Sequence, residues 1–126
     1  MGTRSLTHIE DHGVVVATIY QQFDGYPSGV GAELKRIAGA VEIINGISEY
    51  ETVGPHANGM GCLAAQIVGA LKKDIGGVYL YAPGSSNCGE EFTYTLYEAA
   101  GRVHCRAAGH GFEYDGSLAE MPTETV

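Results

Sequence analysis

Aromatic, hydroxyl and basic side chains alternate with aliphatic ones along three predicted strands in the second half of the chain. Because side chains alternate between the two faces of a strand, an aliphatic core face leaves these residues on the other face: Tyr79, Tyr81, Thr93, Thr95, Arg102, His104 and Arg106. Aromatic rings stack on nucleobases, arginine binds phosphate, and hydroxyls read base edges. The pattern predicts a nucleotide-binding face, although Tyr and Thr are also ordinary strand formers and arginines can pair with surface acids.

Two turn-rich segments add candidates with weaker support. The loop 83–89 (PGSSNCG) contains Asn87, whose amide can recognise a base edge or a ribose hydroxyl beside glycines that allow close backbone contact. An ordinary turn is the equal alternative, and the loop lacks the GK[ST] sequence of a P-loop. The turn 23–29 (FDGYPSG) is interpreted as a folding element. The pair Arg4–Ser5 is interpreted in the same way, although an arginine at the start of a strand can reach phosphate in an oligomer.

Three cysteines and five histidines raise the question of a metal site or a nucleophile. No CxxC or HxxxH spacing is present, which argues against zinc. A Cys–His pair, formed by Cys88 or Cys62 with His104, stays open, but no motif selects it. Nothing supports a paired-carboxylate or Ser/His/Asp hydrolase. We therefore expect no metal, no cofactor and no enzymatic activity.

The balance of charge narrows the range of partners. Seven Lys and Arg against 15 Asp and Glu give a net charge of −8 over 126 residues. Proteins that bind duplex nucleic acid or anionic membranes are normally basic, so neither partner is expected, whereas a few local cations suffice for a small anion. No segment has the roughly 18 apolar residues of a transmembrane helix, and the start MGTRSLTHIED is not typical of a signal peptide. The odd number of widely spaced cysteines favours reduced thiols in the cytoplasm.

The elements that must position these residues follow an α+β pattern. Strands are predicted over 5–10, 14–21, 78–81, 91–98 and 102–107, helices over 28–40 and 59–73, and a short strand is ambiguous at 42–44. The order β-β-α-(β)-α-β-β-β predicts a single domain, 1–126, with an antiparallel sheet and about two helices packed on one face. Residues from about 110 to 126 are expected to wrap the surface or form a flexible tail. Because so small a chain buries a modest core, we expect it to oligomerise.

Several segments together resemble a family of small phage-encoded proteins: MGTRSLTHIED, IYQQFDGYPSGVGAEL, IINGIS, ANGMGCLAAQIV, GGVYLYAPG and CGEEFTYTLYE. The chain is similar, over about residues 1–98, to the first type of anti-Thoeris signal sponges. The resemblance implies sequestration, without cleavage, of cyclic ADP-ribose isomers made by TIR-domain immune enzymes. It also implies a host-cell cytoplasmic location, hexamers built from dimers, and a separate site for cyclic di- or trinucleotides of anti-phage (CBASS) signalling.

The resemblance also implies site residues. An aromatic stack, an asparagine and an arginine correspond best to Tyr79 or Tyr81, Asn87, and Arg106, with Arg102 as second choice. The separate second site is expected near a symmetry axis, among Arg4, Ser5, Thr7, Gln22, Asp24 and Tyr26.

Two functions of other classes stay open beside sequestration. One is a small cyclic-nucleotide hydrolase that uses His104 with a cysteine or a carboxylate. The other is a phage structural or adaptor protein that binds a protein through the tyrosine-rich sheet and has no nucleotide ligand.

Overall fold

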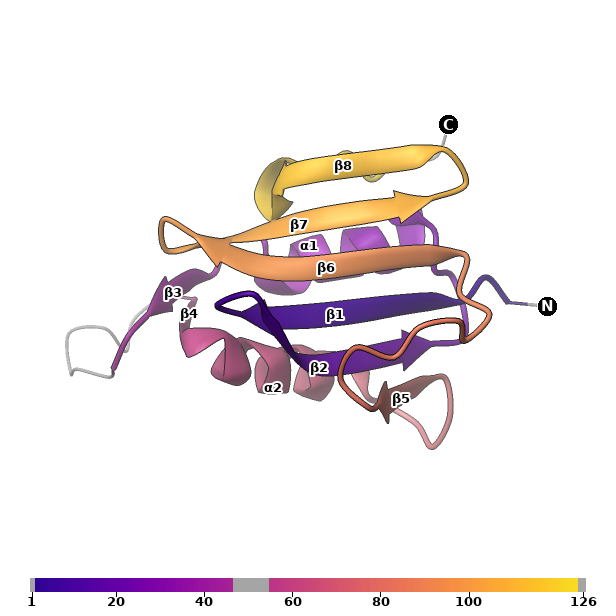
Figure 1. Ribbon diagram of the computed structural model, residues 1–126, viewed down its shortest axis with the longest axis horizontal. Helices are drawn as coiled ribbons and strands as arrows, with labels where there is room; N and C mark the ends of the chain where they lie inside the picture. The colour runs from indigo at the N-terminus through magenta and orange to yellow at the C-terminus, as the bar shows by residue number, and fades with distance from the viewer. Residues whose placement is uncertain (1, 47–54, 125–126) are drawn as a thin grey trace.

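An eight-stranded sheet with two α-helices on one side makes up the fold in the computed structural model, which describes residues 2–46 and 55–124 (Figure 1). The strands are β1 (Ser5–Asp11), β2 (Val14–Gln21), β3 (Glu42–Ile44), β4 (His56–Asn58), β5 (Val78–Tyr81), β6 (Phe92–Ala99), β7 (Arg102–Gly109) and β8 (Phe112–Ser117). The helices are α1 (Ala32–Ala38), which continues a π-helical turn over Pro27–Gly31, and α2 (Gly59–Leu71). The predicted α+β class with two helices on one face is therefore confirmed.

The sheet is mixed, which corrects the predicted antiparallel arrangement. Its order is β4-β3-β7-β6-β1-β2-β5, with β8 paired to β7, and β1 runs parallel to β6. The cause is the connection 82–91, which runs back along the strand direction in front of β2 and delivers β6 beside β1 (Figure 1). The local pattern of a strand carries no information on which neighbour it meets, so neither this parallel pair nor that of β3 with β4 was predictable from it.

The C-terminal segment contributes to the sheet. The sequence predicted no strand after residue 109, but β8 pairs antiparallel with β7 over six residue pairs. The following 3₁₀ turn, Leu118–Glu120, places Leu118 in the core, and Met121 is fully buried beside it. Residues 110–124 are thus largely part of the folded structure, and residues 125–126 lie outside the described chain.

The core lies between the sheet and the helices. Leu34 of α1 and Leu63 and Ile67 of α2 are completely buried against Ile19 and Leu96 of the sheet. Each such side chain contributes about 1.5–3 kcal/mol relative to an exposed one. Because side chains alternate along each strand, the aromatic, hydroxyl and basic side chains singled out in the sequence lie on the side of the sheet away from the helices.

We call this second surface the polar face. Its side chains come from six strands: Leu6, His8, Glu10, Thr18, Tyr20, Tyr79, Tyr81, Thr93, Thr95, Tyr97, Arg102, His104, Arg106, Glu113 and Asp115. The loop 82–91 passes over part of it (Figure 1), which explains why Leu6 is fully buried on a face without helices.

The turn around Gly25 clamps the start of β1 to the helical layer. Gly25 N–H donates to the Thr3 carbonyl, Val30 N–H donates to the Asp24 carbonyl, and the buried Tyr94 hydroxyl donates to the Gly25 carbonyl at 2.7 Å. The FDGYPSG turn therefore has the structural role that its composition favoured. Within the described residues, no helix is long and apolar enough to cross a bilayer.

Candidate nucleotide-binding face

One transverse row of the polar face brings together the most prominent predicted residues. Strand registers place Tyr81 opposite Thr18, Thr18 opposite His8, His8 opposite Thr95, Thr95 opposite Arg106, and Arg106 opposite Asp115. We call this set the transverse row: Tyr81, Thr18, His8, Thr95, Arg106 and Asp115. Residues as far apart in the chain as His8 and Asp115 thus lie along one line across six strands.

Three tyrosines form a cluster at the β5 end of the row. Tyr20 stacks on Tyr81 with ring centroids 4.9 Å apart and an interplanar angle of 5°, and it meets Tyr79 in a tilted contact at 6.2 Å. Tyr79 and Tyr81 stay 43% and 37% exposed, so part of each ring is accessible to a ligand, and Lys72 Nζ lies over the Tyr79 ring at 5.2 Å from its centroid. Planar, partly exposed rings of this kind are the usual platform for a nucleobase.

The middle of the row holds the loop 82–91 in place. Gly84 N–H donates to Thr18 Oγ1 at 2.9 Å, and Thr18 Oγ1 lies 2.8 Å from His8 Nδ1. The simplest complete arrangement has the Thr18 hydroxyl donating to an unprotonated Nδ1. Burial lowers the pKa of His8 and outweighs the opposite influence of Glu90 and Glu10. A neutral His8 therefore completes the chain of hydrogen bonds that fastens the loop.

This arrangement predicts a pH dependence of stability. The unfolded chain binds a proton at His8 near pH 6.5, whereas the folded chain resists it, so the contribution of His8 is complete above that pH. This contribution to stability is lost as the pH falls below about 6.5, and the loss levels off below the lowered pKa of His8 in the folded chain. We expect the free energy of unfolding, measured with urea from pH 7.5 to 5, to fall less steeply for His8→Asn, whose amide oxygen replaces Nδ1. Equal slopes for both chains would contradict this assignment.

Arg106 forms a second cluster at the opposite end of the row. Its guanidinium lies over the Tyr97 ring, 4.7 Å from the centroid, and its Nη2 pairs with Glu10 Oε2 at 2.8 Å. The Tyr97 hydroxyl donates in turn to Asp115 Oδ1. That hydrogen bond, reinforced by burial, raises the pKa of Tyr97 to about 12, so the phenol stays protonated and keeps Asp115 engaged.

Arg106 is consequently both oriented and accessible. A guanidinium has five N–H donors. Within the described part of the chain, the hydrogen bond of this guanidinium to Glu10 uses Nη2. The hydrogen bond to Glu10 raises the pKa of Arg106, so it is a permanent cation. With 44% of its side chain exposed, Arg106 is accessible to an anionic ligand.

The other predicted residues of this face occupy supporting positions. Thr93 and Thr95 are half-buried on β6, and His104 packs against the Tyr97 ring at 5.5 Å. Arg102 lies at the exposed start of β7, where His104 Nδ1 is 3.3 Å from its carbonyl. Asn87 is exposed in the loop with a φ of 56°, a left-handed turn conformation that asparagine tolerates. None of these residues completes either cluster.

The two clusters are built on strands that lie well apart in the sheet. Four strand spacings separate β5 from β7 in the sheet order, which corresponds to roughly 19 Å along the sheet. The predicted combination of ring, asparagine and arginine is therefore present on one face, but as two half-sites.

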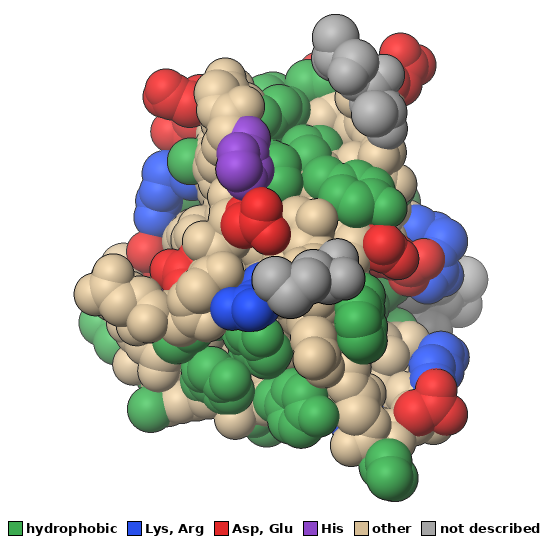
Figure 2. Space-filling model, turned by 90° about the vertical axis from the view of Figure 1, so that its right-hand side faces the viewer, with side chains coloured by type: hydrophobic (Ala, Val, Ile, Leu, Met, Phe, Trp, Pro, Cys, Tyr) green, Lys and Arg blue, Asp and Glu red, His purple; other side chains and the backbone are tan. Residues whose placement is uncertain are grey.

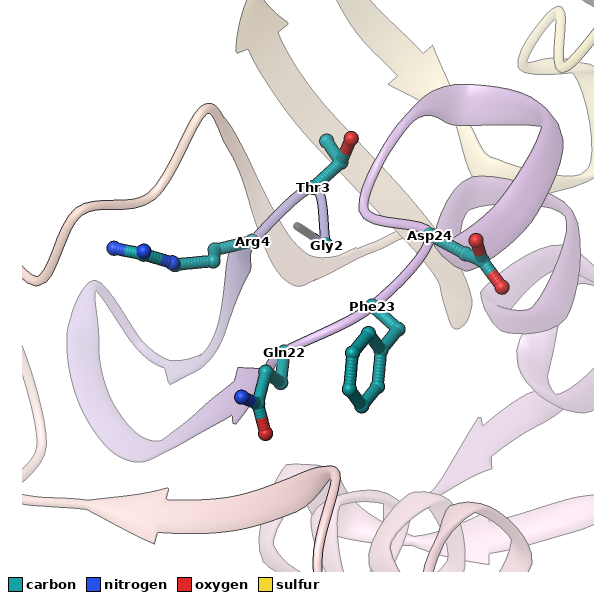
Figure 3. A pocket seen from close by; sticks show the side chains of 6 residues that line it. All are labelled: Gly2, Thr3, Arg4, Gln22, Phe23 and Asp24. Carbon is teal, nitrogen blue, oxygen red and sulfur yellow. The ribbon is translucent and has the colours of Figure 1, made fainter.

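The predicted second site is only partly assembled. Arg4, Gln22 and Asp24 line a hollow of about 480 Å³ with Gly2, Thr3 and Phe23 (Figure 3). Their side chains do not converge, since Arg4 extends to the side opposite Asp24, and the Phe23 ring lies between Gln22 and Asp24 (Figure 3).

The remaining second-site candidates lie elsewhere. Ser5 and Thr7 are fully buried on the helix side of the sheet, because alternation turns them inward. Tyr26 donates to Asp24 and lines a different hollow, beside Phe92 and His110. On this end of the molecule basic side chains occur singly among acidic ones, without a continuous basic patch (Figure 2).

Candidate nucleophiles and ligands for a metal do not assemble around His104. Cys62 lies on α2, across the sheet from the polar face, and Cys88 lies close enough to Tyr81 to affect that phenol. Burial raises the pKa of Cys105 to about 12, so this thiol stays un-ionised. Among residues 2–46 and 55–124, no group of three His, Cys, Asp or Glu side chains is placed to hold a metal ion.

Four residues of the two clusters were missed by the sequence analysis: Tyr20, Glu10, Tyr97 and Asp115. Tyr20 alternates with Ile19 and Gln21 within a predicted strand, but the sequence does not show that β2 pairs with β5, which brings Tyr20 to Tyr79 and Tyr81. Glu10 and Asp115 had no local signal, because their roles depend on strands far apart in the chain.

Comparisons with known proteins add no relative. A scan against protein-family models, a search of curated proteins and a search of solved structures each found no match.

Proposed function

We propose that this protein binds a cyclic ADP-ribose-type signalling molecule at its polar face and sequesters it without cleavage. The observation that carries the proposal is the oriented Arg106, stacked on Tyr97 and still exposed. Arginine held in this way matches phosphate oxygens through two parallel hydrogen bonds. The stacked Tyr20 and Tyr81 rings supply the complementary platform for a base.

A second copy of the chain is part of the proposal. Tyr81 and Arg106 are carried by strands roughly 19 Å apart along the sheet, and both are partly exposed. Each half-site therefore needs a facing surface to enclose a ligand. A copy packed on the polar face supplies one, and the lowered dielectric of an enclosed site strengthens each charge-assisted bond. Long-range attraction cannot replace enclosure, because the net charge of −8 repels anions.

The resemblance to phage anti-Thoeris sponges supports the same ligand class and a role in evading host immunity in the cytoplasm. By that resemblance, assembly proceeds through dimers to hexamers, and cyclic di- or trinucleotides form a second ligand class. The hollow beside Arg4, Gln22 and Asp24 is the part of the predicted second site that is open to such a ligand. The separation of Cys62 and Cys88 from His104 weighs against the hydrolase alternative.

Thermal unfolding with cyclic ADP-ribose tests the proposal. Selective binding to the folded chain stabilises it by about 2.7 kcal/mol at a hundredfold excess of ligand over Kd, and we expect a corresponding rise in Tm. After the protein is boiled, the ligand should be recovered chemically intact at the stoichiometry at which it was bound. Recovery of hydrolysed product, or turnover by substoichiometric protein, would establish the hydrolase instead.

Exposed apolar side chains near β5 favour the adaptor as a second candidate. Ile75 is fully exposed and Leu80 is 65% exposed, beside a hollow of about 330 Å³ lined by Val68 and Val78. Lys72 Nζ donates to the Val78 carbonyl at 2.8 Å on the free edge of β5, which hinders addition of another strand. A protein partner would therefore contact the exposed side chains and not the strand edge. If the protein is such an adaptor, its Tm should stay unchanged when a series of nucleotides is added.

A further inference from the structure

The ion pair between Arg106 and Glu10 has a consequence for any anion that binds at the polar face. Glu10 lies on β1 and Arg106 on β7, so their side chains meet above the intervening strand β6. Glu10 shares the polar face with His8, two residues earlier, and the ladder between β1 and β2 shifts register between Ile9 and Glu10. The Glu10 side chain is only 17% exposed, which marks a built contact and not a loose surface pair.

Two carboxylates lie near Arg106, and they differ in the group that they contact. Asp115 is directly opposite on β8, and its Oδ1 accepts the Tyr97 hydroxyl, so it is held by a neighbour of Arg106. Glu10 uses one oxygen, Oε2, to contact Nη2 of the guanidinium. Arg106 thus lies near two carboxylates. Glu10 pairs with Arg106 directly, whereas Asp115 accepts a hydrogen bond from Tyr97.

We propose that Glu10 is an internal competitor for Arg106, so that an anionic ligand binds at this cluster by displacing the Glu10 carboxylate. The inference rests on the proposed function and names the residue that sets its affinity and its ligand class. Ligands that present two phosphate oxygens to the guanidinium exchange one charge-assisted hydrogen bond for two. Ligands with a single anionic atom gain nothing by the exchange, so the cluster selects phosphate groups over halide ions.

The Tyr97 ring makes this exchange geometrically simple. Because the guanidinium rests on the ring and the ring is tethered to Asp115, loss of the Glu10 contact leaves Arg106 oriented. The arginine therefore loses little side-chain freedom when the ligand replaces Glu10, which keeps the cost of the exchange low.

Calorimetric titration of the full chain with inorganic pyrophosphate tests the inference. We expect Glu10→Gln to tighten pyrophosphate binding about fivefold, the scale of a partly exposed ion pair, and to leave chloride binding undetectable. Glu113→Gln is the matched control. Glu113 is exposed on the same face, opposite Ala108, and its substitution changes the net charge by the same amount. It should change the affinity by less than twofold.

Two further variants separate contact from charge and keep the test decisive. Glu10→Asp retains the carboxylate but shortens the side chain, so it should also tighten binding; it serves as well if Glu10→Gln folds poorly. In an Arg106→Ala background, Glu10→Gln should lose its effect. Equal tightening by the Glu10 and Glu113 variants, or none by either, would overturn the inference. Pyrophosphate binding that persists unchanged in Arg106→Ala would instead overturn the assignment of Arg106 in the proposed function.

Discussion

Gly25→Ala is expected to lower the free energy of unfolding by about 3 kcal/mol, the upper end for overpacking a tight site. A Cβ at this position would lie 2.9 Å from Ser5 Cβ and 2.9 Å from the Thr3 carbonyl oxygen. Ser5 is the first residue of β1 and Thr3 lies two residues before it, and contacts this short require the backbone to shift. The shift would also strain the hydrogen bonds to the Thr3 carbonyl and from Tyr94, which join β1, β6 and the helical layer.

Urea unfolding followed by circular dichroism measures this effect, and Gly69→Ala is its control. Gly69 lies in α2 with no atom within 4 Å of an added Cβ, so alanine should stabilise the helix by about 0.5–1 kcal/mol. The same chemical change is thus expected to act with opposite signs at two positions. Similar effects at both would show that the Gly25 turn can relax and is no clamp.

Arg106→Ala is expected to weaken binding of cyclic ADP-ribose about hundredfold. Two hydrogen bonds from a guanidinium to phosphate oxygens correspond to about 2.7 kcal/mol, and no other cation of the described residues contacts the Tyr97 platform. Arg106→Ala also removes the partner of the Glu10 carboxylate, whose side chain is only 17% exposed, so we expect some loss of stability in the free protein as well. Calorimetric titration gives the loss, and thermal unfolding without ligand verifies the fold.

Arg102→Ala provides the comparison for this loss. Arg102 lies on the same strand and face and carries the same charge, but it is at the exposed start of β7, away from the Tyr97 ring contact. Its substitution should weaken binding by less than threefold. Losses of similar size in the two variants would mean that general charge, and not the Arg106 geometry, attracts the ligand.

Much of the fold followed from local sequence patterns. The β-branched and aromatic run over Val14–Gln21 predicted a strand. The alternation in Phe92–Ala99 predicted both a strand and its buried face, because apolar residues at every second position mark the side that packs on the core. The three-residue strand His56–Asn58 and the acidic, glycine-containing β8 escaped prediction. Their strand form depends on pairing with β3 and β7, which overrides weak intrinsic preference.

For the candidate site too, local patterns predicted part of the arrangement and strand pairing decided the rest. Alternation correctly assigned Tyr81, Thr95 and Arg106 to one face. It could not place them in one row, since register arises from pairings between distant strands. Ser5 and Thr7 face the core together with Ile9, as alternation along β1 requires, although the preceding Arg4 is partly exposed.

By itself, the amino-acid sequence determined the α+β class, the two helices and the residue types on each face, because propensity and hydrophobic periodicity act within a few residues. Only the tertiary structure decided that β1 and β6 run parallel and that Tyr20 stacks on Tyr81. It alone brought Glu10 to Arg106, across 96 positions of the chain. These contacts depend on the order and register of strands, which follow from how the whole chain buries its apolar face and not from any one segment.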